Sequence, residues 1–207
     1  MVRIFLIFAT LLFSIQVAFA KPLRLLALGD SLTSGFGLEP NEAFPVKLEA
    51  ALKNRYPDLK IINGGVAGDT AADGLARLDW VLANDVDGII VELGANDALR
   101  GLDVSQTEGA LDGIMAKAED RKLPVLILGM KAPPNMGPEY VAKFDSLYLR
   151  LAEKYQTLLY PFYLDGVAAN PDLNQADGIH PNGPGVDVIV SKVMPSVEEL
   201  IGKVWVK

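Results

Sequence analysis

The sequence contains three residues whose types and spacing suit acyl transfer: Ser31, Asp177 and His180. His180 is the only histidine among the 207 residues, so a general base of the imidazole type must be this residue. Asp177 precedes it by three positions, close enough on a turn for the carboxylate to orient the ring and stabilise the imidazolium. Ser31 lies in the run Gly-Asp-Ser-Leu at 29–32, and the chain has no cysteine to supply a thiol nucleophile. Together they predict a serine nucleophile, a histidine base and an orienting aspartate.

Two further loops, both rich in small and polar residues, offer donors for a developing oxyanion. Residues 63–70 read Asn-Gly-Gly-Val-Ala-Gly-Asp-Thr, and residues 94–97 read Gly-Ala-Asn-Asp. An oxyanion needs preorganised N–H groups, and the candidates are the Ser31 backbone, the glycine-loop backbone and the Asn96 side-chain amide. Each loop taken alone is also typical of an ordinary turn, and its glycines weakly suggest a phosphate cradle. The order and placement of all four loops favour acyl transfer.

The elements that must position these loops alternate between short apolar runs and amphipathic stretches. The runs that we expect to form strands are Leu23–Leu28, Leu59–Asn63, Gly88–Leu93, Val125–Met130 and Leu158–Tyr163. Their nearly continuous hydrophobicity is typical of parallel strands covered on both faces. Thr70 and Asp73 predict a capping box that opens a helix over 70–80, with further helices between the later strands and at the C-terminus. We therefore expect a three-layer α/β/α sandwich whose functional loops meet beyond the carboxyl ends of the strands.

The first 20 residues differ from the rest of the chain and predict a secretory signal peptide. Arg3 is followed by the apolar run Ile4–Phe13, and Ala18-Phe19-Ala20 has the small-residue pattern of a cleavage site. A membrane anchor is the alternative, but the apolar run is short for a bilayer span. We expect cleavage after Ala20, a mature chain that forms one domain over residues 21–207, and a periplasmic or secreted location.

The composition narrows the class of partner. The formal net charge of −7 becomes −8 when Arg3 is lost with the signal peptide. Such a chain lacks the basic footprint of a nucleic-acid-binding protein, and an anionic membrane surface would repel it. We expect no nucleic acid, no stable membrane insertion and a monomer. Because the chain has no cysteine, its stability rests on the core rather than on disulfides.

Across residues 21–207 the chain resembles the SGNH (GDSL) hydrolase family. The family's four blocks correspond to Gly-Asp-Ser-Leu at 29–32, Gly68 before Asp69-Thr70, Gly94-x-Asn96-Asp97, and Asp177-x-x-His180. The resemblance implies a flavodoxin-like five-stranded parallel sheet and a Ser-His-Asp acyl-enzyme mechanism that needs no metal or cofactor. The site that it implies is a Ser31–His180–Asp177 triad, with oxyanion donors from Ser31, Gly68 and Asn96. The implied substrates are small acyl esters and thioesters, such as aryl and short-chain esters, acyl-CoA and lysophospholipids.

Three other functions stay open on the residues alone. Asp30, Asp69 and Asp97 could gather with Asp177 around the divalent metal of a phosphohydrolase, although bonding to loop backbone is the favoured interpretation of the first three. A carbohydrate acetylesterase could use the same catalytic framework. A non-catalytic binding module would leave the serine and the histidine without a role.

Several residues outside the four blocks also carry expectations. Glu92 lies inside an apolar strand, where an unpaired carboxylate is unfavourable, so we expect it to bond to loop backbone rather than to catalyse. Phe36, Leu99, Leu102 and the stretch Met130–Met136 could border an acyl groove, although core packing explains isolated apolar residues equally well. The resemblance implies that residues 98–103 form a mobile loop beside the acyl site, and we hypothesise that this loop gates acyl-chain length.

Overall fold

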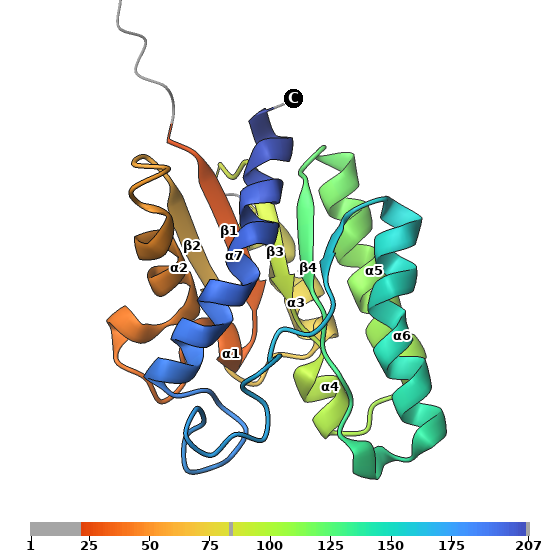
Figure 1. The fold of residues 1–207 in the computed structure, drawn as a ribbon. Coiled ribbons are helices and arrows are strands. Elements are labelled where there is room, and N and C mark those ends of the chain that lie inside the picture. The colour runs from red at the N-terminus through yellow and green to blue at the C-terminus, as the bar shows by residue number, and fades with distance from the viewer. Residues whose placement is uncertain (1–21, 83–84, 206–207) are drawn as a thin grey trace, which may run out of the picture.

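The computed structural model describes residues 22–82 and 85–205, so the predicted signal peptide lies outside the described residues. Within this part of the chain, five parallel strands form one sheet in the order β2-β1-β3-β4-β5 (Figure 1). The strands are β1 (Arg24–Gly29), β2 (Lys60–Gly65), β3 (Gly88–Glu92), β4 (Val125–Leu128) and β5 (Leu158–Tyr160). This is the flavodoxin-like order, in which the direction of winding switches between β1 and β3.

Helices cover both faces of the sheet and complete three layers (Figure 1). On one face α2 (Phe44–Leu52) packs against α7 (Gly183–Trp205). On the other face α5 (Val104–Asp120) packs between α3 (Ala71–Val81) and α6 (Pro138–Tyr155). The predicted α/β/α sandwich is confirmed. The shorter helical segments are α1 (Ser31–Ser34), η1 (Pro40–Glu42), α4 (Ala95–Leu99) and η2 (Pro134–Met136).

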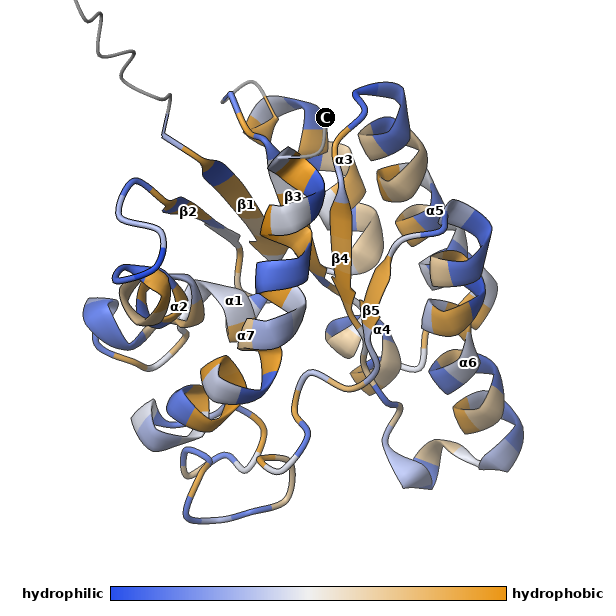
Figure 2. Ribbon diagram, turned by 45° about the horizontal axis from the view of Figure 1, so that its top comes forward, coloured by the Kyte–Doolittle hydropathy of each residue, from blue (hydrophilic) through white to orange (hydrophobic). Residues whose placement is uncertain are grey.

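Burial of apolar side chains explains where these elements form. Strands β3 and β4 are buried along their whole length, as expected for parallel strands with helices on both faces. Strand β4 is correspondingly coloured as hydrophobic in Figure 2. Helices α5 and α7 bury residues at helical spacing, for example Leu111, Ile114 and Met115 in α5. Each leucine or isoleucine removed from water in this way contributes about 1.5–3 kcal/mol. None of the described helices is long and apolar enough to cross a lipid bilayer.

The observed elements differ from the predicted ones mainly at their ends. Strand β5 ends at Tyr160 rather than at Tyr163, because Pro161 has no amide hydrogen to donate to the ladder. The capping box is confirmed: the Asp73 N–H donates to Thr70 Oγ1 at 3.2 Å, and the Thr70 N–H donates to Asp73 Oδ2 at 3.0 Å. Helix α4 was not predicted, because five residues are too few to show a helical period.

Candidate active site

The four predicted loops meet at the edge where the strands end, which is the lower edge of the sheet in Figure 1. Ser31 begins α1 directly after β1, Gly68 lies in the loop after β2, and Asn96 lies in α4 after β3. The segment 161–182 follows β5 and returns His180 to this edge, where its ring bonds to Ser31. The site therefore lies beside the switch point between β1 and β3, the usual ligand position in such sheets.

A continuous hydrogen-bond chain joins Ser31, His180 and Asp177. Ser31 Oγ donates to His180 Nε2 at 2.9 Å, although the two residues are 149 positions apart in the sequence. His180 Nδ1 donates to Asp177 Oδ2 at 2.7 Å. With Nδ1 donating to the carboxylate, Nε2 presents the lone pair that a general base needs. The geometry is that of a nucleophile, a base and an orienting carboxylate in sequence.

The Asp177 turn is encoded locally by the run Asp-Gly-Ile-His. Asp177 Oδ1 accepts from the N–H groups of Ile179 at 2.9 Å and His180 at 3.0 Å, which leaves Oδ2 for the imidazole. Gly178 has a φ of +70°, a left-handed conformation that glycine adopts without steric cost. The hydrogen bond from the His180 ring, and then the two backbone bonds, lower the pKa of Asp177 from 3.8 to about 2. The carboxylate is therefore ionised at neutral pH.

Gln175 ties the loop that carries His180 to the loop that follows Ser31. Its Nε2 donates to the Phe36 carbonyl at 2.8 Å and to the Pro181 carbonyl at 3.0 Å, and its N–H donates to the His180 carbonyl at 2.8 Å. The Phe36 ring lies against the imidazole, with 4.9 Å between ring centroids. No sequence signal pointed to Gln175, because its partners are backbone atoms that only the fold brings together.

The candidate oxyanion donors differ in how they are engaged. Neither the Ser31 N–H nor the Gly68 N–H donates to an acceptor within residues 22–82 and 85–205. Asn96 Nδ2, by contrast, donates to Asp30 Oδ2 and to the Asp69 carbonyl, each at 3.0 Å. Gly68 has a φ of +87° and therefore favours glycine. Two backbone donors are thus free for a ligand, while the amide already has two partners.

The aspartates of these loops bond to protein groups instead of converging. Asp97 accepts from the Ala71 N–H and from the Thr107 hydroxyl, both at 3.0 Å. Asp69 forms an ion pair with Arg77 at 2.6 Å rather than bonding to backbone. Within the described part of the chain, no three His, Asp or Glu side chains are grouped so that they could hold a metal ion. The favoured backbone-bonding role is found for Asp97 and, through the Leu32 N–H, for Asp30.

Two buried carboxyl groups, those of Asp30 and Glu92, adjoin the nucleophile turn. Glu92 Oε2 accepts from the Thr33 hydroxyl at 2.7 Å and from the Asp30 N–H at 3.4 Å, so the expected bond from Glu92 to loop backbone is confirmed. Burial raises the pKa of Asp30 from 3.8 to about 6, against the lowering effect of bonds from Leu32 and Asn96. Burial, and then repulsion by Asp30, raises the pKa of Glu92 well above its ordinary range.

Comparison with known proteins identifies the family. The model of the GDSL-like Lipase/Acylhydrolase family matches residues 27–188. The chain belongs to this family. Its membership confirms the predicted SGNH (GDSL) relationship and the prediction of a carboxylic ester hydrolase.

Individual relatives of this hydrolase match over most of their length. Esterase TesA of Pseudomonas aeruginosa is 36% identical over 178 residues, which are 86% of this chain and 89% of the relative. Thioesterase 1/protease 1/lysophospholipase L1 of Escherichia coli K12 is 33% identical and covers 86% of this chain and 84% of its own. The crystal structure of AlinE4, an SGNH-hydrolase family esterase, is 44% identical, with a TM-score of 0.74 over 88% of this chain and 98% of its own.

A pocket of about 700 Å³ lies between the segment after α4 and the start of α6 in this hydrolase. Leu102, Met136 and Tyr140 are among its lining residues, and the Tyr140 hydroxyl donates to the Leu102 carbonyl at 2.9 Å. Of the residues expected to border an acyl groove, Leu102 and Met136 therefore line a pocket. Phe36 and Leu99 are about half exposed, whereas Met130 is buried in the core.

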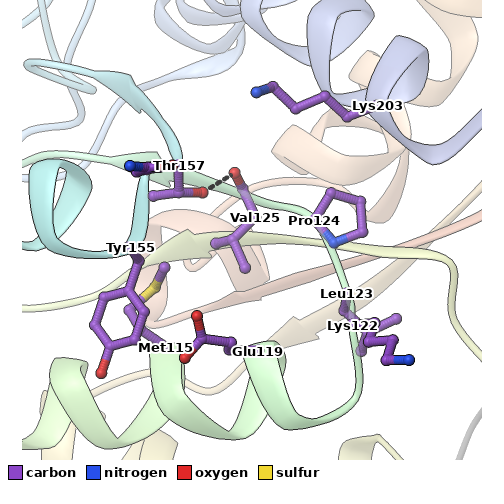
Figure 3. A pocket seen from close by; sticks show the side chains of 10 residues that line it. Met115, Glu119, Lys122, Leu123, Pro124, Val125, Tyr155, Thr157 and Lys203 are labelled. Carbon is purple, nitrogen blue, oxygen red and sulfur yellow. Dashed lines mark hydrogen bonds between the residues drawn. The ribbon is translucent and has the colours of Figure 1, made fainter. Parts of the chain in front are cut away.

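A second pocket, of about 360 Å³, lies at the opposite edge of the sheet, where β4 and β5 begin (Figure 3). It is lined by the last turns of α5 and α6, and Lys203 approaches it from α7. Within it the Thr157 hydroxyl donates to the Val125 carbonyl at 2.5 Å. None of the candidate site residues lines this pocket.

Proposed function

We propose that the hydrolase cleaves carboxylic esters and thioesters through an acyl-enzyme on Ser31, with His180 as general base and Asp177 as the orienting carboxylate. The observation that carries this proposal is the hydrogen-bond chain from Ser31 Oγ to His180 Nε2 and from Nδ1 to Asp177 Oδ2. The 2.9 Å between Ser31 Oγ and His180 Nε2 is short enough for direct proton transfer. The 2.7 Å between His180 Nδ1 and Asp177 Oδ2 is a hydrogen bond that can hold the ring in this orientation.

The reaction proceeds in two acyl transfers. Ser31 Oγ attacks the carbonyl carbon while its proton passes to His180 Nε2, and the carbonyl electrons move onto oxygen. When this tetrahedral species collapses, the bond to the leaving thiolate or alkoxide breaks, and that group takes the proton from Nε2. Water then attacks the acyl-enzyme with the same base, and the acid leaves. Asp177 stabilises the imidazolium that is present at both stages.

We propose that the oxyanion is held by the candidate donors on Ser31, Gly68 and Asn96. The Ser31 and Gly68 N–H groups supply two donors that need no rearrangement. Asn96 supplies the third donor when one of its amide hydrogens leaves the Asp69 carbonyl and bonds to the oxyanion instead. This exchange is favourable because a hydrogen bond to an ionised acceptor is roughly twice as strong as one to a neutral carbonyl.

Small apolar acyl or aryl esters and thioesters are the proposed substrates. Exposed apolar side chains lie on each of the four segments that form the site, namely Phe36, Val66, Leu99 and Ile179. Apolar surface of this kind favours an acyl chain or an aromatic ring over a sugar. The relative from Escherichia coli is named a thioesterase and a lysophospholipase, which supports acyl thioesters and lysophospholipids as substrates to assay.

Export is part of the proposal. The run from Arg3 through the apolar stretch to Ala18-Phe19-Ala20 supports a signal peptide and a periplasmic or secreted enzyme. Mass spectrometry of the exported protein tests this, and an N-terminus at Lys21 is the expected result. Exported protein that retains its first 20 residues would refute it.

The central test compares the mature wild type with Ser31→Ala and with Ser34→Ala on p-nitrophenyl esters and acyl-CoA. Ser34 lies on the same short helix, and its hydroxyl donates to the Ser31 carbonyl at 3.3 Å, which makes it a matched control. We expect Ser31→Ala to abolish turnover, and we expect a fluorophosphonate to label Ser31 in the wild type and in Ser34→Ala but to leave Ser31→Ala unlabelled. Equal losses in the two variants, or labelling of another residue, would contradict the proposal.

A further inference from the structure

Glu92 is a buried carboxyl group that the acyl-enzyme mechanism does not use. Its side chain is 1% exposed, and within the described residues its Oε1 atom has no hydrogen-bond donor. Asp30 is completely buried, its N–H donates to Glu92 Oε2 at 3.4 Å, and its carboxyl group is close enough to that of Glu92 to repel it when both are charged. An ionised carboxylate only accepts hydrogen bonds, so two carboxyl groups bond to each other only when one of them carries a proton.

The donors around the pair decide which group carries the proton. The Asp30 carboxylate accepts from the Leu32 N–H at 2.9 Å and from Asn96 Nδ2 at 3.0 Å, and both bonds favour its charged form. Glu92 accepts at Oε2 from Thr33 and from the Asp30 N–H, so a proton on Oε1 displaces no existing bond. The charge therefore belongs on Asp30 and the proton on Glu92.

We propose that Glu92 holds a proton at neutral pH, donates it to the Asp30 carboxylate, and thereby positions the nucleophile turn and the Asn96 amide. Glu92 ties the end of β3 to the Asp30 N–H and the Thr33 hydroxyl, which flank Ser31. Asp30 in turn holds the Asn96 amide. Neither carboxyl group touches the reacting atoms, so both are positioning residues, and this inference rests on the acyl-enzyme function proposed above.

The proton also limits the negative charge next to the oxyanion. A second carboxylate at Glu92 would repel both Asp30 and the developing oxyanion. Tyr148 from α6 and Tyr163 after β5 face the pair, and burial raises the pKa of both well above 10, so neither supplies charge. His180 faces Asp30 from the last loop, and its imidazolium favours a charged Asp30 during the reaction. Arg77 from α3 donates to the Gly29 carbonyl and pairs with Asp69.

Two substitutions of Glu92 distinguish a role as a proton donor from a role that only fills space. In Glu92→Gln the amide group keeps one acceptor and one donor in the places of Oε2 and the protonated Oε1. Glu92→Leu has a similar volume and no polar atom. We expect the leucine variant to lose roughly tenfold or more in kcat on p-nitrophenyl esters, with KM little changed, and the glutamine variant to recover most of that loss.

The pH dependence of stability gives a readout that does not need activity. The pKa of Glu92 is higher in the folded state than its ordinary value of 4.5. The protonated side chain therefore stabilises the fold, and this stabilisation is complete when the pH is below 4.5. That contribution is lost as the pH rises through the folded-state pKa. Glutamine has no proton to lose, so the melting temperature of Glu92→Gln should gain on that of the wild type as the pH rises above 4.5.

Asp97→Asn is the matched buried control. Both of its oxygens accept hydrogen bonds, so an amide nitrogen there faces a donor, and we expect a lower melting temperature across the whole pH range. Carboxyl ¹³C spectra complete the test, because the resonance missing from Glu92→Gln should have the shift of a protonated acid at pH 7.

Equal activity loss in Glu92→Gln and Glu92→Leu, a melting difference that is flat with pH, or an ionised resonance would each overturn the inference. A wild type without esterase activity would instead refute the acyl-enzyme function. The carboxyl ¹³C spectra and the pH dependence of the melting temperature would then still test whether Glu92 is protonated at neutral pH.

Discussion

Gln175→Ala tests whether the loop carrying His180 must be tied down for catalysis. The substitution removes the two bonds from Nε2 to the carbonyls of Phe36 and Pro181, at 2.8 and 3.0 Å. Hydrogen bonds of this kind contribute about 0.5–1.5 kcal/mol each, so their loss weakens the docking of the loop by about 2 kcal/mol. Since 1.36 kcal/mol corresponds to a factor of ten, the population with His180 placed against Ser31 falls by at most about 30-fold.

The expected result is a fall in kcat of between about 3-fold and 30-fold on p-nitrophenyl esters, with KM nearly unchanged. The melting temperature should fall by about 4 °C. Asn182→Ala is the control, because its Nδ2 bonds to the carbonyls of Asp172 and Asn174 within the same loop and does not reach Phe36. It should reduce stability at least as much while reducing kcat less. A Gln175→Ala enzyme with the kcat of the wild type, or an Asn182→Ala enzyme that loses as much kcat, would refute the reasoning.

Three further outcomes follow from the geometry of the site. Asn96→Ala should lower kcat by about 10²–10³ on p-nitrophenyl esters, and an effect confined to KM would count against an oxyanion role. The depressed pKa of Asp177, about 2, makes its ionised form stabilising above 3.8, and this contribution is lost as the pH falls to about 2. The melting difference between wild type and Asp177→Asn should therefore narrow in that window, and a constant difference would contradict the assigned hydrogen bonds. Gly178→Ala should destabilise the fold by about 1 kcal/mol, as measured by calorimetry, because the φ of Gly178 is +70°. The control is Gly109→Ala in α5, which has open space around it and should stabilise the fold by about 0.5–1 kcal/mol. A Gly178→Ala variant more stable than the wild type would be inconsistent with the turn.

Much of the fold could be predicted because the order of apolar and polar residues within each strand and helix indicates which side chains are buried. The five apolar runs became the five strands, with boundaries within a few residues, and the Thr70–Asp73 capping box formed as expected. The end of β5 was wrong because a hydrophobic run does not show where hydrogen bonding stops, and Pro161 stops it. The order of the strands came from the resemblance, since periodicity says nothing about which strand lies beside which.

The site was predictable to the extent that its chemistry depends on residue type. A unique histidine, an aspartate three residues before it and a serine after the first strand were sufficient to name three side chains that the structure joins by hydrogen bonds. The engagement of Asn96 with both Asp30 and the Asp69 carbonyl was not predictable, because one of its partners is a backbone atom on another loop.

The sequence by itself determined three features of the hydrolase: which side chain can act as a base, which local turn brings Asp177 to His180, and which apolar runs must be buried. These are properties of single residues and of neighbours within one turn of chain. Only the tertiary structure decided that Gln175 bonds to Phe36 and that Glu92 meets Asp30, because those contacts join residues 139 and 62 positions apart. Such pairs become neighbours through the packing of the sheet, and burial of Glu92 beside a second carboxyl group then raises its pKa above that of an isolated glutamate.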